Sequence, residues 1–312
     1  MSQGNLGEQS FKIQDASSYD SVADRYDRFI HRFSAPLVVR MMDLAQLRPS
    51  EKVLDIGTGT GIVALQAAKN VAPDGKIIGV DLSDGMLAAA SAKASREGLS
   101  SRVEFRKMDA EALALESVSF DAVVSLFALR HFPNPLMALK EMYRVLRPGG
   151  RLVIGVGSGP PLFSVTGLVH RLGRLPEFLL KVPGRRLVAC DFLNGLVERF
   201  LPNPDGPNEA QWTKENPRLT QSVPSLVHAA RFGKVRCYWQ GQQATIQSPE
   251  EFWDLQVTFS SIARKRIAAA PQEKVNALRQ EFAATCSRVQ SRGGKLIYPT
   301  GALFVYGERS EA

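Results

Sequence analysis

The first half of the chain alternates short apolar runs with segments whose apolar residues recur every three or four positions. Short β-branched runs bounded by glycine predict strands, and the longer spacing predicts helices. The predicted strands are 52–56, 76–80, 102–105, 120–125 and 151–156, and the predicted helices are 62–69, 85–93 and 136–146. Strands separated by helices are typical of an α/β fold, in which helices cover both faces of a parallel sheet.

The second half has a less regular pattern. A helix is predicted over 225–232, a strand over 234–240, a long helical region over 249–289 and a final strand over 296–307. Residues 157–218 are rich in proline and glycine, with short amphipathic pieces between them. This contrast places the regular sheet in the first half.

One uncharged stretch is long enough to raise the question of a membrane. Residues 152–169 form a run of 18 without charge, close to the lower limit for a spanning helix. The run contains several glycines and the pair Pro160-Pro161, which end a strand more readily than they continue a helix. We therefore predict a strand and a loop. The first fifteen residues have no apolar core, so we predict no secretory signal.

Composition excludes several classes of protein. With 312 residues, 44% of them hydrophobic and 22% charged, the chain is neither disordered nor collagen-like. Its three cysteines, Cys190, Cys237 and Cys286, are far apart in sequence and form no CxxC pair. This favours unlinked thiols in a reducing interior over a disulfide framework or a zinc site. We expect a cytoplasmic protein without a metal.

The net charge of +8 is unevenly distributed. Residues 1–150 hold 18 Lys or Arg and 18 Asp or Glu, whereas residues 151–312 hold 21 and 13. A nucleic-acid enzyme could show such an excess, since phosphate contacts need cations. Here the basic residues are dispersed, and those within 163–188 alternate with apolar ones. We favour a solvated surface, with 163–188 as a pocket wall or a peripheral membrane contact.

The strongest chemical signal is the sequence VLDIGTGTG, residues 53–61, between the first strand and the first helix. Alternate glycines at Gly57, Gly59 and Gly61 let a ligand lie against bare main chain. Asp81 ends the next strand, where a carboxylate can accept both hydroxyls of a ribose. An adenosine-type cofactor is therefore predicted, either a nicotinamide dinucleotide or S-adenosylmethionine.

Glycine spacing bears on this choice. A dinucleotide turn needs G-x-G-x-x-G. Counted from Gly57, the third glycine falls on Ile62; counted from Gly59, it falls on Ala64, which is tolerated, so the spacing leaves both cofactors open. No GK[ST] follows, which excludes a Walker phosphate loop.

Four motifs in order resemble the class I, Rossmann-like S-adenosylmethionine-dependent methyltransferases over residues 17–156. They are VLDIGTGTG, VDLS at 80–83, MDAE at 108–111, and the pair FDAVVSLFALRHF and EMYRVLRPGGRLVI. The segments ALRH, MYRVL and YDSVADRYD look like the ubiquinone/menaquinone C-methyltransferase (UbiE-like) subfamily. The resemblance implies a seven-stranded, mostly parallel sheet with an antiparallel last strand, helices on both faces and inserted cap elements.

The resemblance also implies roles for individual residues. The three glycines would pass beneath the methionine part of S-adenosylmethionine, Tyr26 would close over it, and Asp81 would hold the ribose. Leu82 and Met86 would sandwich the adenine, Asp109 and Ala110 would hydrogen-bond it, and Ser125 and Leu126 would face the sulfonium. Asp55 and Thr58 of the glycine loop complete the implied cofactor site.

An acceptor that must lose a proton needs a general base. His131 follows the fourth strand, where the acceptor should arrive, and a histidine titrates near neutral pH. A structural role, capping the helix that begins near Pro135, is the alternative. Arg130 matches a subfamily position associated with the quinone ring and could stabilise a phenolate. His131 replaces the asparagine usual in the quinone enzymes.

Four regions follow from these assignments: a helical lid over 1–45, a cofactor-binding core over 46–156, a substrate cap over 157–218, and the end of the fold over 219–312 with a helical insertion at 241–295.

The expected substrate is a small or lipid-like molecule of aromatic, quinone or polyketide type, methylated at carbon or oxygen. A homodimer is among the oligomeric states left open. A nucleic-acid or protein methyltransferase and a non-catalytic cofactor-binding protein are the alternatives, but SLFA at 125–128 is unlike the [ND]PP[YF] signature of base methylation, and no nucleic-acid partner is expected.

Overall fold

The computed structural model describes residues 3–159, 186–189, 191–201 and 222–311. The chain divides into two compact units, each with its own core. Unit 1 comprises Met1–Gly157, Thr213–Gln240 and Ala302–Ala312, and unit 2 comprises Ser158–Trp212 and Gly241–Gly301.

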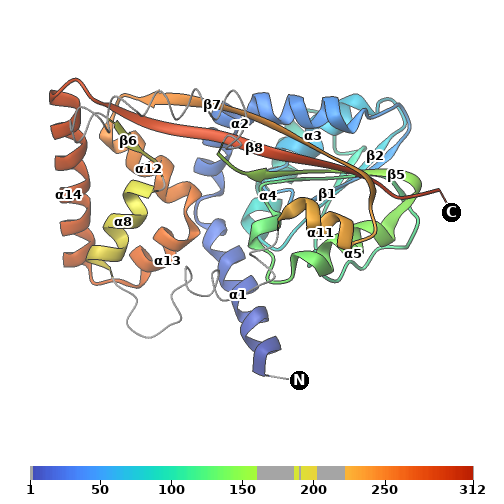
Figure 1. The fold of residues 1–312 in the computed structure, drawn as a ribbon, viewed down its shortest axis with the longest axis horizontal. Helices are drawn as coiled ribbons and strands as arrows, with labels where there is room; N and C mark the ends of the chain where they lie inside the picture. Colours follow the sequence, from blue (N-terminus) through green and yellow to red (C-terminus); the bar gives the residue numbers. More distant parts are fainter. Residues whose placement is uncertain (1–2, 160–185, 190, 202–221, 312) are drawn as a thin grey trace. The chain divides into compact units, whose positions relative to one another are not determined.

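Unit 1 contains a sheet with helices on either side (Figure 1). Its elements in chain order are α1 Gln3–Asp20, α2 Ala23–Ala45, β1 Lys52–Ile56, α3 Ile62–Asn70, β2 Lys76–Asp81, α4 Asp84–Arg96, β3 Val103–Lys107, β4 Phe120–Leu126, the 3₁₀ turn η1 Leu129–His131, α5 Pro135–Val145, β5 Leu146–Gly157 and α11 Val223–Ala229. Two strands are shared with unit 2 by sequence, β7 Gly233–Ile246 and β8 Lys295–Glu308.

The strand order is β3-β2-β1-β4-β5-β8, and the first five strands are parallel. β8 runs antiparallel to β5, with Leu152 opposite Gly307. β7 also pairs with β8. This topology confirms the predicted mostly parallel sheet with an antiparallel last strand. It also places the carboxyl ends of β1, β2 and β4 along one edge.

Alternate residues of the strands enter two separate cores. Val53 of β1 and Val124 of β4 pack with α2 and α3 on one face. Leu54 of β1 and Val123 of β4 pack with α5 and α11 on the other. Because successive side chains point to opposite faces, a near-continuous apolar run is what a strand buried on both faces requires. The helices lie on these two faces in Figure 1.

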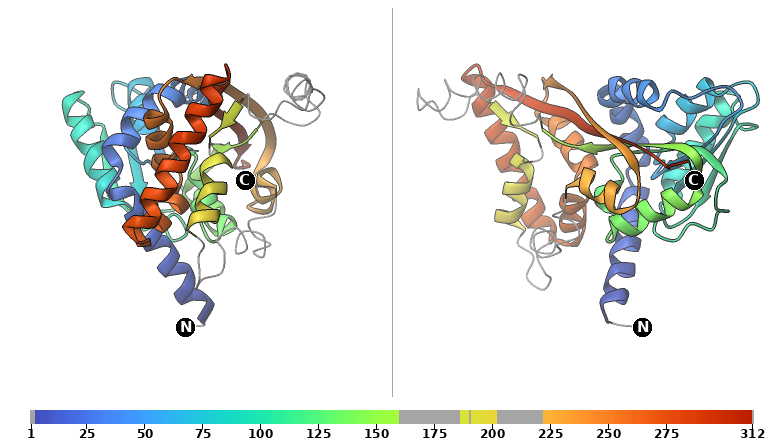
Figure 2. Two further views of the ribbon diagram at one scale, coloured as in Figure 1. Left: turned by 90° about the vertical axis from the view of Figure 1, so that its left-hand side faces the viewer. Right: turned by 45° about the vertical axis from the view of Figure 1, so that its right-hand side comes forward.

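Two N-terminal helices complete unit 1 without having been predicted from periodicity. α2 packs against α3 and α4, and α1 packs against α4 (Figure 2). The first turns of α1 extend beyond the sheet (Figure 1). The exposed Gln46, in the left-handed region with φ 45°, ends α2.

Unit 2 is built from helices around an aromatic core. Its described elements are β6 Arg186–Val188, α8 Asp191–Phe200, α12 Pro249–Phe259, α13 Ser261–Ala269 and α14 Gln272–Ser291. The ring of Phe282 lies 5.0 Å from that of Trp253 and 5.8 Å from that of Phe252. β6 pairs in parallel with the first residues of β8, which adds an eighth strand to the seven predicted.

The expected boundaries differ from the structure at several places. The strand expected over 234–240 continues to Ile246, so the first residues of the helical insertion expected over 241–295 are strand, and the helix expected over 225–232 is Val223–Ala229. The long helical region over 249–289 is three helices, because Ser260 caps α13 through the N–H of Ala263 and Pro271 precedes α14. The helix expected to end at 146 ends at Val145, and β5 begins with the next residue. The pairing of β4 with β5 shifts register between Phe120, which pairs with Leu146, and Ala122, which pairs with Arg151.

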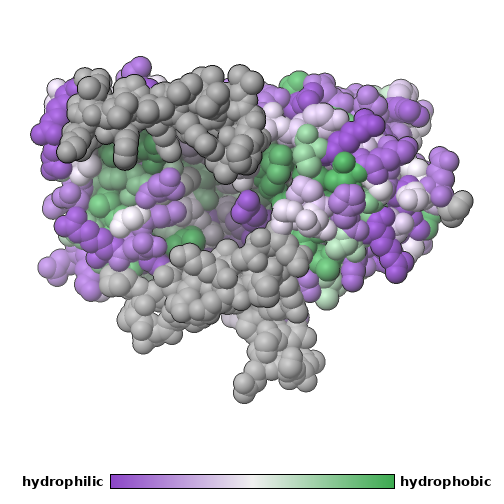
Figure 3. Space-filling view, in the orientation of Figure 1, coloured by the Kyte–Doolittle hydropathy of each residue, from purple (hydrophilic) through white to green (hydrophobic). Residues whose placement is uncertain are grey.

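None of the described helices is long and apolar enough to cross a bilayer. Figure 3 shows hydrophilic residues interspersed with small hydrophobic groups on the visible face. Most of the apolar-basic segment 163–188 lies outside the described residues, as do Cys190 and residues 160–185 and 202–218 of the expected cap. Cys237 is exposed and Cys286 is buried, and both are free thiols.

Candidate active site

The turn between β1 and α3 is built on three glycines with positive φ. Gly57, Gly59 and Gly61 have φ of 67°, 53° and 81°, a region that favours glycine. The N–H groups of Gly57 and Thr58 both donate to the carbonyl of Val80, at 2.8 and 2.9 Å. A Cβ on Gly57 would lie 2.2 Å from the Cβ of Ala128. The turn is therefore closely packed, and a side chain at position 57 would displace it.

Asp55 supports this turn from its buried side. Its carboxylate is 1% exposed and accepts a hydrogen bond from Thr58 Oγ1 at 2.7 Å. Burial raises the pKa of Asp55 to about 7, although the hydrogen bonds from Thr58 and from the N–H of Ala64 oppose the shift. Asp55 thus links the turn to the first residues of α3.

Asp81 at the end of β2 faces the turn. Its two carboxylate oxygens accept from the N–H of Gly59 at 2.9 Å and from the N–H of Ser83 at 3.0 Å. Burial raises the pKa of Asp81, and these backbone hydrogen bonds act against that rise. The side chain borders a cavity together with Gly57 and Gly59. A hydrogen-bond acceptor and bare main chain therefore meet at the carboxyl ends of β1 and β2.

The cavity lies entirely within unit 1 and has a volume of about 120 Å³. One side, the strand-end side, consists of residues at or after the ends of β1, β2, β3 and β4. The other side, the α1 face, consists of Lys12, Asp15, Ala16 and Tyr19. These four positions have the spacing of one helix face, so α1 covers the strand ends with a single stripe of side chains.

An ion pair connects the α1 face to the strand-end side. Lys12 Nζ lies 2.6 Å from Asp109 Oδ2 and 2.8 Å from Glu111 Oε2. Burial lowers the pKa of Lys12, but its hydrogen bonds to these two carboxylates outweigh that effect, and the pKa is raised. The ammonium group is therefore held in its charged form beside Asp109.

The end of α1 is attached to the start of α4. Asp20 Oδ1 accepts from Ser83 Oγ at 2.6 Å and from the N–H of Gly85 at 2.9 Å. A Cβ on Gly85 would lie 2.8 Å from the Cα of Asp20, so the two backbones approach closely. Since Ser83 also caps α4 through the N–H of Met86, one cluster fixes both the helix and the covering segment.

His131 sits between the two sides. Its Nδ1 lies 2.9 Å from Asp15 Oδ2, and its ring meets that of Tyr19 edge to face at 5.8 Å. Tyr26 meets Tyr19 in the same manner at 5.9 Å. Three consecutive residues of a 3₁₀ turn point in three directions. In η1, therefore, Leu129 is buried, Arg130 is exposed and His131 borders the cavity.

The segment after β4 adds aromatic side chains. Phe127 and Phe132 both line the cavity. Phe127 has φ 66°, an uncommon conformation for a bulky residue, and its N–H donates to the carbonyl of Gly155 at 2.7 Å. Sparsely populated backbone conformations cluster at functional sites.

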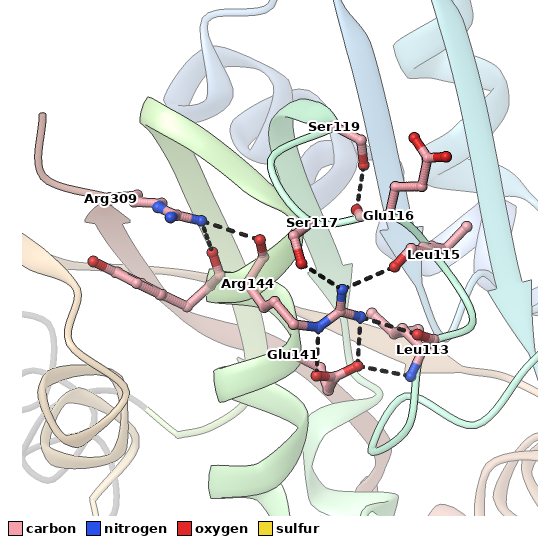
Figure 4. Close-up of polar contacts among 9 residues, drawn as sticks. Leu113, Leu115, Glu116, Ser117, Ser119, Glu141, Arg144 and Arg309 are labelled. Carbon is pink, nitrogen blue, oxygen red and sulfur yellow. Dashed lines mark hydrogen bonds and ion pairs between the residues drawn. The ribbon is translucent and has the colours of Figure 1, made fainter. Parts of the chain in front are cut away.

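Behind the strand-end side, Arg144 of α5 fixes the segment that follows Asp109 and Glu111 (Figure 4). Its guanidinium donates to the carbonyls of Leu113 and Leu115 at 2.9 and 2.8 Å. It also binds both carboxylate oxygens of Glu141, lowering the pKa of that carboxyl group. Glu141 accepts in turn from the N–H of Leu113 at 2.9 Å.

Comparison with known proteins agrees with this geometry. Residues 54–154 match the family model described as a methyltransferase domain. The demethylmenaquinone methyltransferase of Thermus thermophilus is 38% identical over 188 residues, which are 58% of this chain and 84% of that protein. The ubiquinone/menaquinone biosynthesis C-methyltransferase UbiE of Teredinibacter turnerae is 34% identical over 225 residues, 72% of this chain and 82% of that protein. The chain belongs to the class I S-adenosylmethionine-dependent methyltransferases.

A solved structure extends the likeness in fold to most of the methyltransferase. The structure is that of phosphoethanolamine N-methyltransferase 2 of Haemonchus contortus in complex with S-adenosyl-L-methionine. The alignment spans 96% of this chain and 60% of the Haemonchus chain, with a TM-score of 0.53. At 18% identity this comparison concerns the fold alone. The predicted membership in the methyltransferase family and its UbiE-like relationship are confirmed.

The cavity of the methyltransferase brings together ten of the fifteen predicted site residues. They are Tyr26, Gly57, Gly59, Asp81, Leu82, Met86, Asp109, Ala110, Leu126 and His131. Asp55, Thr58 and Gly61 support the glycine turn instead of lining this cavity. Ser125 is fully buried, and its Oγ donates to the carbonyl of Ile56 at 2.9 Å. Arg130 points to solvent because of its place in η1.

The α1 face was not predicted as part of the site. Its helical spacing, Lys12, Asp15, Ala16 and Tyr19, is present in the sequence, yet the partners of these side chains lie about a hundred positions away. In the part of the chain that the structure describes, no group of three or more His, Cys, Asp or Glu residues could hold a metal ion.

Proposed function

We propose that this methyltransferase binds S-adenosylmethionine in the cavity of unit 1 and methylates a small or lipid-like acceptor of aromatic, quinone or polyketide type. The observation that carries the proposal is the Asp81 carboxylate beside the bare Gly57–Gly61 turn in one cavity. When bound, S-adenosylmethionine supplies a methyl group already activated by a sulfonium. The residues of the chain must then align the acceptor and exclude water.

The residues present fit this cofactor. A Cβ at position 57 would collide with Ala128, so the turn is kept free of side chains where a ligand would pass. The carboxylate of Asp81 has each oxygen held by a backbone N–H, which leaves acceptor capacity for two neighbouring hydroxyls. Met86 is buried and Leu82 partly exposed at the same cavity, as apolar contacts for a planar base.

These contacts assign the parts of the cofactor. Asp81 would hold the ribose, Leu82 and Met86 would enclose the adenine, and Asp109 and the N–H of Ala110 would bind its edge. Tyr26 supports a covering role, because its Cε1 would lie 3.9 Å from a Cβ on Gly59. Ser125 is left out of this assignment because its hydroxyl is occupied inside the core.

Three aromatic side chains, Tyr19, Phe127 and Phe132, support a planar apolar acceptor in the same cavity as His131. Aromatic rings favour contacts with other rings beyond simple burial. The quinone-type names of the relatives point the same way. We therefore place a quinol or a related phenol first among the acceptor classes.

His131 is the base in this proposal. Its side chain is 40% exposed and lies at the cavity, where it can accept a proton from an acceptor hydroxyl. Arg130 receives no role because it does not reach the cavity. A peripheral membrane contact, a homodimer, and the lid and cap roles of the regions stay predictions.

A methyl-transfer assay tests the proposal. Full-length protein would be incubated with S-adenosylmethionine carrying a tritiated methyl group and with one of three acceptors: a short-chain demethylmenaquinol, bulk transfer RNA, or a protein extract. We expect label in the quinol fraction for the wild type and at least a tenfold loss for His131→Ala. Label in RNA or protein alone would overturn the proposed acceptor class, and label in none of them would count against turnover of these acceptors.

A further inference from the structure

His131 has two ring nitrogens, and only one of them can serve an acceptor in the cavity. Nδ1 is 2.9 Å from Asp15 Oδ2. In the described part of the chain, Nε2 of His131 makes no hydrogen bond, and the side chain borders the cavity. The partner of Nδ1 therefore decides what Nε2 can do.

Asp15 is a buried carboxylate carried by α1. It is 4% exposed, whereas the His131 side chain is 40% exposed. An ionised carboxylate can only accept hydrogen bonds, so a neutral imidazole facing it must donate through Nδ1–H. The lone pair of that tautomer is on Nε2. We propose that Asp15 is a positioning residue that holds His131 as the Nδ1–H tautomer, with Nε2 ready to take a proton from the acceptor hydroxyl.

The proposal rests on the proposed function and deepens it by naming a residue that positions the base. The acceptor enters as a neutral O–H acid, such as a quinol or phenol. Its O–H bond breaks, the proton forms a bond to Nε2 of His131, and the electron pair stays on the acceptor oxygen. The ring then carries a positive charge next to Asp15, so proton and charge are both accounted for without a further reactant.

Other charged and titratable groups also face this pair. Lys12 and Tyr19 lie on the same face of α1, and Lys12 is neutralised by Asp109 and Glu111. Asp81 of β2 borders the same cavity, and burial raises its pKa. Tyr26 of α2 contacts Tyr19, and Arg130 of η1 is exposed. Of these groups, Asp15 is the one within hydrogen-bond distance of the His131 ring.

The geometry also explains why the base needs α1. His131 is the last residue of η1, a 3₁₀ turn of three residues, and its side chain borders the cavity. A turn of this length gives the side chain little support. Asp15 lies 116 positions away in sequence, on a helix that Asp20 attaches to Ser83. A histidine held in this manner keeps one tautomer and one orientation, whereas an unsupported ring would exchange between both.

The test reads the tautomer directly. Nitrogen-15 spectra of the histidine side chains would be recorded for the full chain with S-adenosylhomocysteine, at about pH 8.5, where an ordinary histidine is neutral. The chain has four histidines, and His131→Asn identifies the signal of interest. We expect the Nδ1–H tautomer in the wild type and the Nε2–H tautomer in Asp15→Asn, whose amide can donate to Nδ1. Asp24→Asn, an exposed carboxylate of α2, should leave the spectrum unchanged.

Kinetic measurements that separate kcat from KM accompany the spectra. With demethylmenaquinol, Asp15→Asn should lower kcat about 100-fold, while KM and the Kd for S-adenosylhomocysteine change less than about twofold. An Nε2–H tautomer in the wild type would overturn the proposal, and that measurement needs no variant. An unchanged tautomer or an unchanged kcat in Asp15→Asn would overturn it as well. If the wild type does not bind S-adenosylhomocysteine, the proposed function itself is wrong.

Discussion

The two sides of the cavity are held in place by different forces. On the strand-end side, backbone hydrogen bonds and close packing fix the glycine turn, as the contacts of Gly57 with Val80 and Ala128 show. On the α1 face, side-chain pairs hold a helix in place: Lys12 with Asp109, Asp15 with His131 and Asp20 with Ser83. The first arrangement is insensitive to ions and to single polar substitutions, whereas the second depends on charges that salt and mutation can remove.

Gly57→Ala should have the largest effect, because it adds a side chain where the strand-end side is most closely packed. Its φ of 67° disfavours alanine, and the new Cβ would lie 2.2 Å from that of Ala128. We expect at least a 100-fold weaker affinity for S-adenosylhomocysteine by calorimetry. Gly98→Ala is the matched control, since Gly98 has φ 68° with no atom within 4 Å of the added Cβ. It should cost only about 1 kcal/mol of stability. Equal losses in both variants would contradict the packing argument.

Lys12→Met tests how side-chain pairs hold the α1 face in place. Removing the ammonium group leaves Asp109 and Glu111 without their cation and α1 without one of its attachments. An ion pair of this kind contributes about 1 kcal/mol, so we expect a roughly fivefold weaker Kd for S-adenosylhomocysteine. In the wild type the same affinity should fall as salt rises, and in Lys12→Met this dependence should be reduced. Lys12→Arg keeps the charge and should stay within about twofold. Tighter binding by Lys12→Met would show that the ion pair opposes the ligand.

Arg144→Gln should separate stability from binding. Arg144 holds the segment beyond Asp109 through several hydrogen bonds, so its loss should lower Tm by about 5 °C, with a change in S-adenosylhomocysteine affinity below about threefold. Arg147→Gln, which removes the more exposed pair with Asp121, serves as the control and should lower Tm by about 1 °C. A larger effect on binding than on Tm would place Arg144 closer to the ligand than the structure does.

Asp55→Asn should change stability only in a pH-dependent manner. Burial raises the pKa of Asp55 to about 7, so the folded state holds a proton that the unfolded state releases above about pH 4. The contribution of this carboxyl group to stability is therefore present at low pH and is lost as the pH rises toward 7. Asparagine does not titrate, so the Tm of the variant relative to the wild type should increase by about 5 °C from pH 5 to pH 8. A difference that is constant with pH would contradict the raised pKa, and Asp43→Asn, on an exposed carboxylate, should show no such trend.

The same contrast explains what could be predicted from sequence. The strand-end side depends on local patterns: β1 was predicted at its observed bounds, and the topology follows from strands alternating with helices. Nine of the ten predicted site residues at the cavity lie at or after strand ends, which share one edge of a parallel sheet, and the tenth, Tyr26, comes from α2. The α1 face depends on pairs separated by about a hundred positions, such as Asp15 with His131, and no local pattern specifies such a pair.

Individual errors have equally physical causes. Ser125 follows the buried alternation of β4, so its hydroxyl turns into the core and bonds to Ile56, a fact that only the register with β1 reveals. Arg130 and His131 are neighbours, and the 3₁₀ turn sends one to solvent and the other to the cavity. The break of 249–289 into three helices follows from Ser260 and Pro271, both of which were visible in the sequence as boundary residues.

The most direct test of the central claim is a calorimetric titration of the wild type and Asp81→Ala with S-adenosylhomocysteine and, separately, with NADH. We predict that the wild type binds S-adenosylhomocysteine and shows no response to NADH. Asp81→Ala should bind S-adenosylhomocysteine at least 100-fold more weakly, since two hydrogen bonds to a charged acceptor are lost. Binding of NADH without a response to S-adenosylhomocysteine, or unchanged affinity in Asp81→Ala, would contradict the assignment of the cavity.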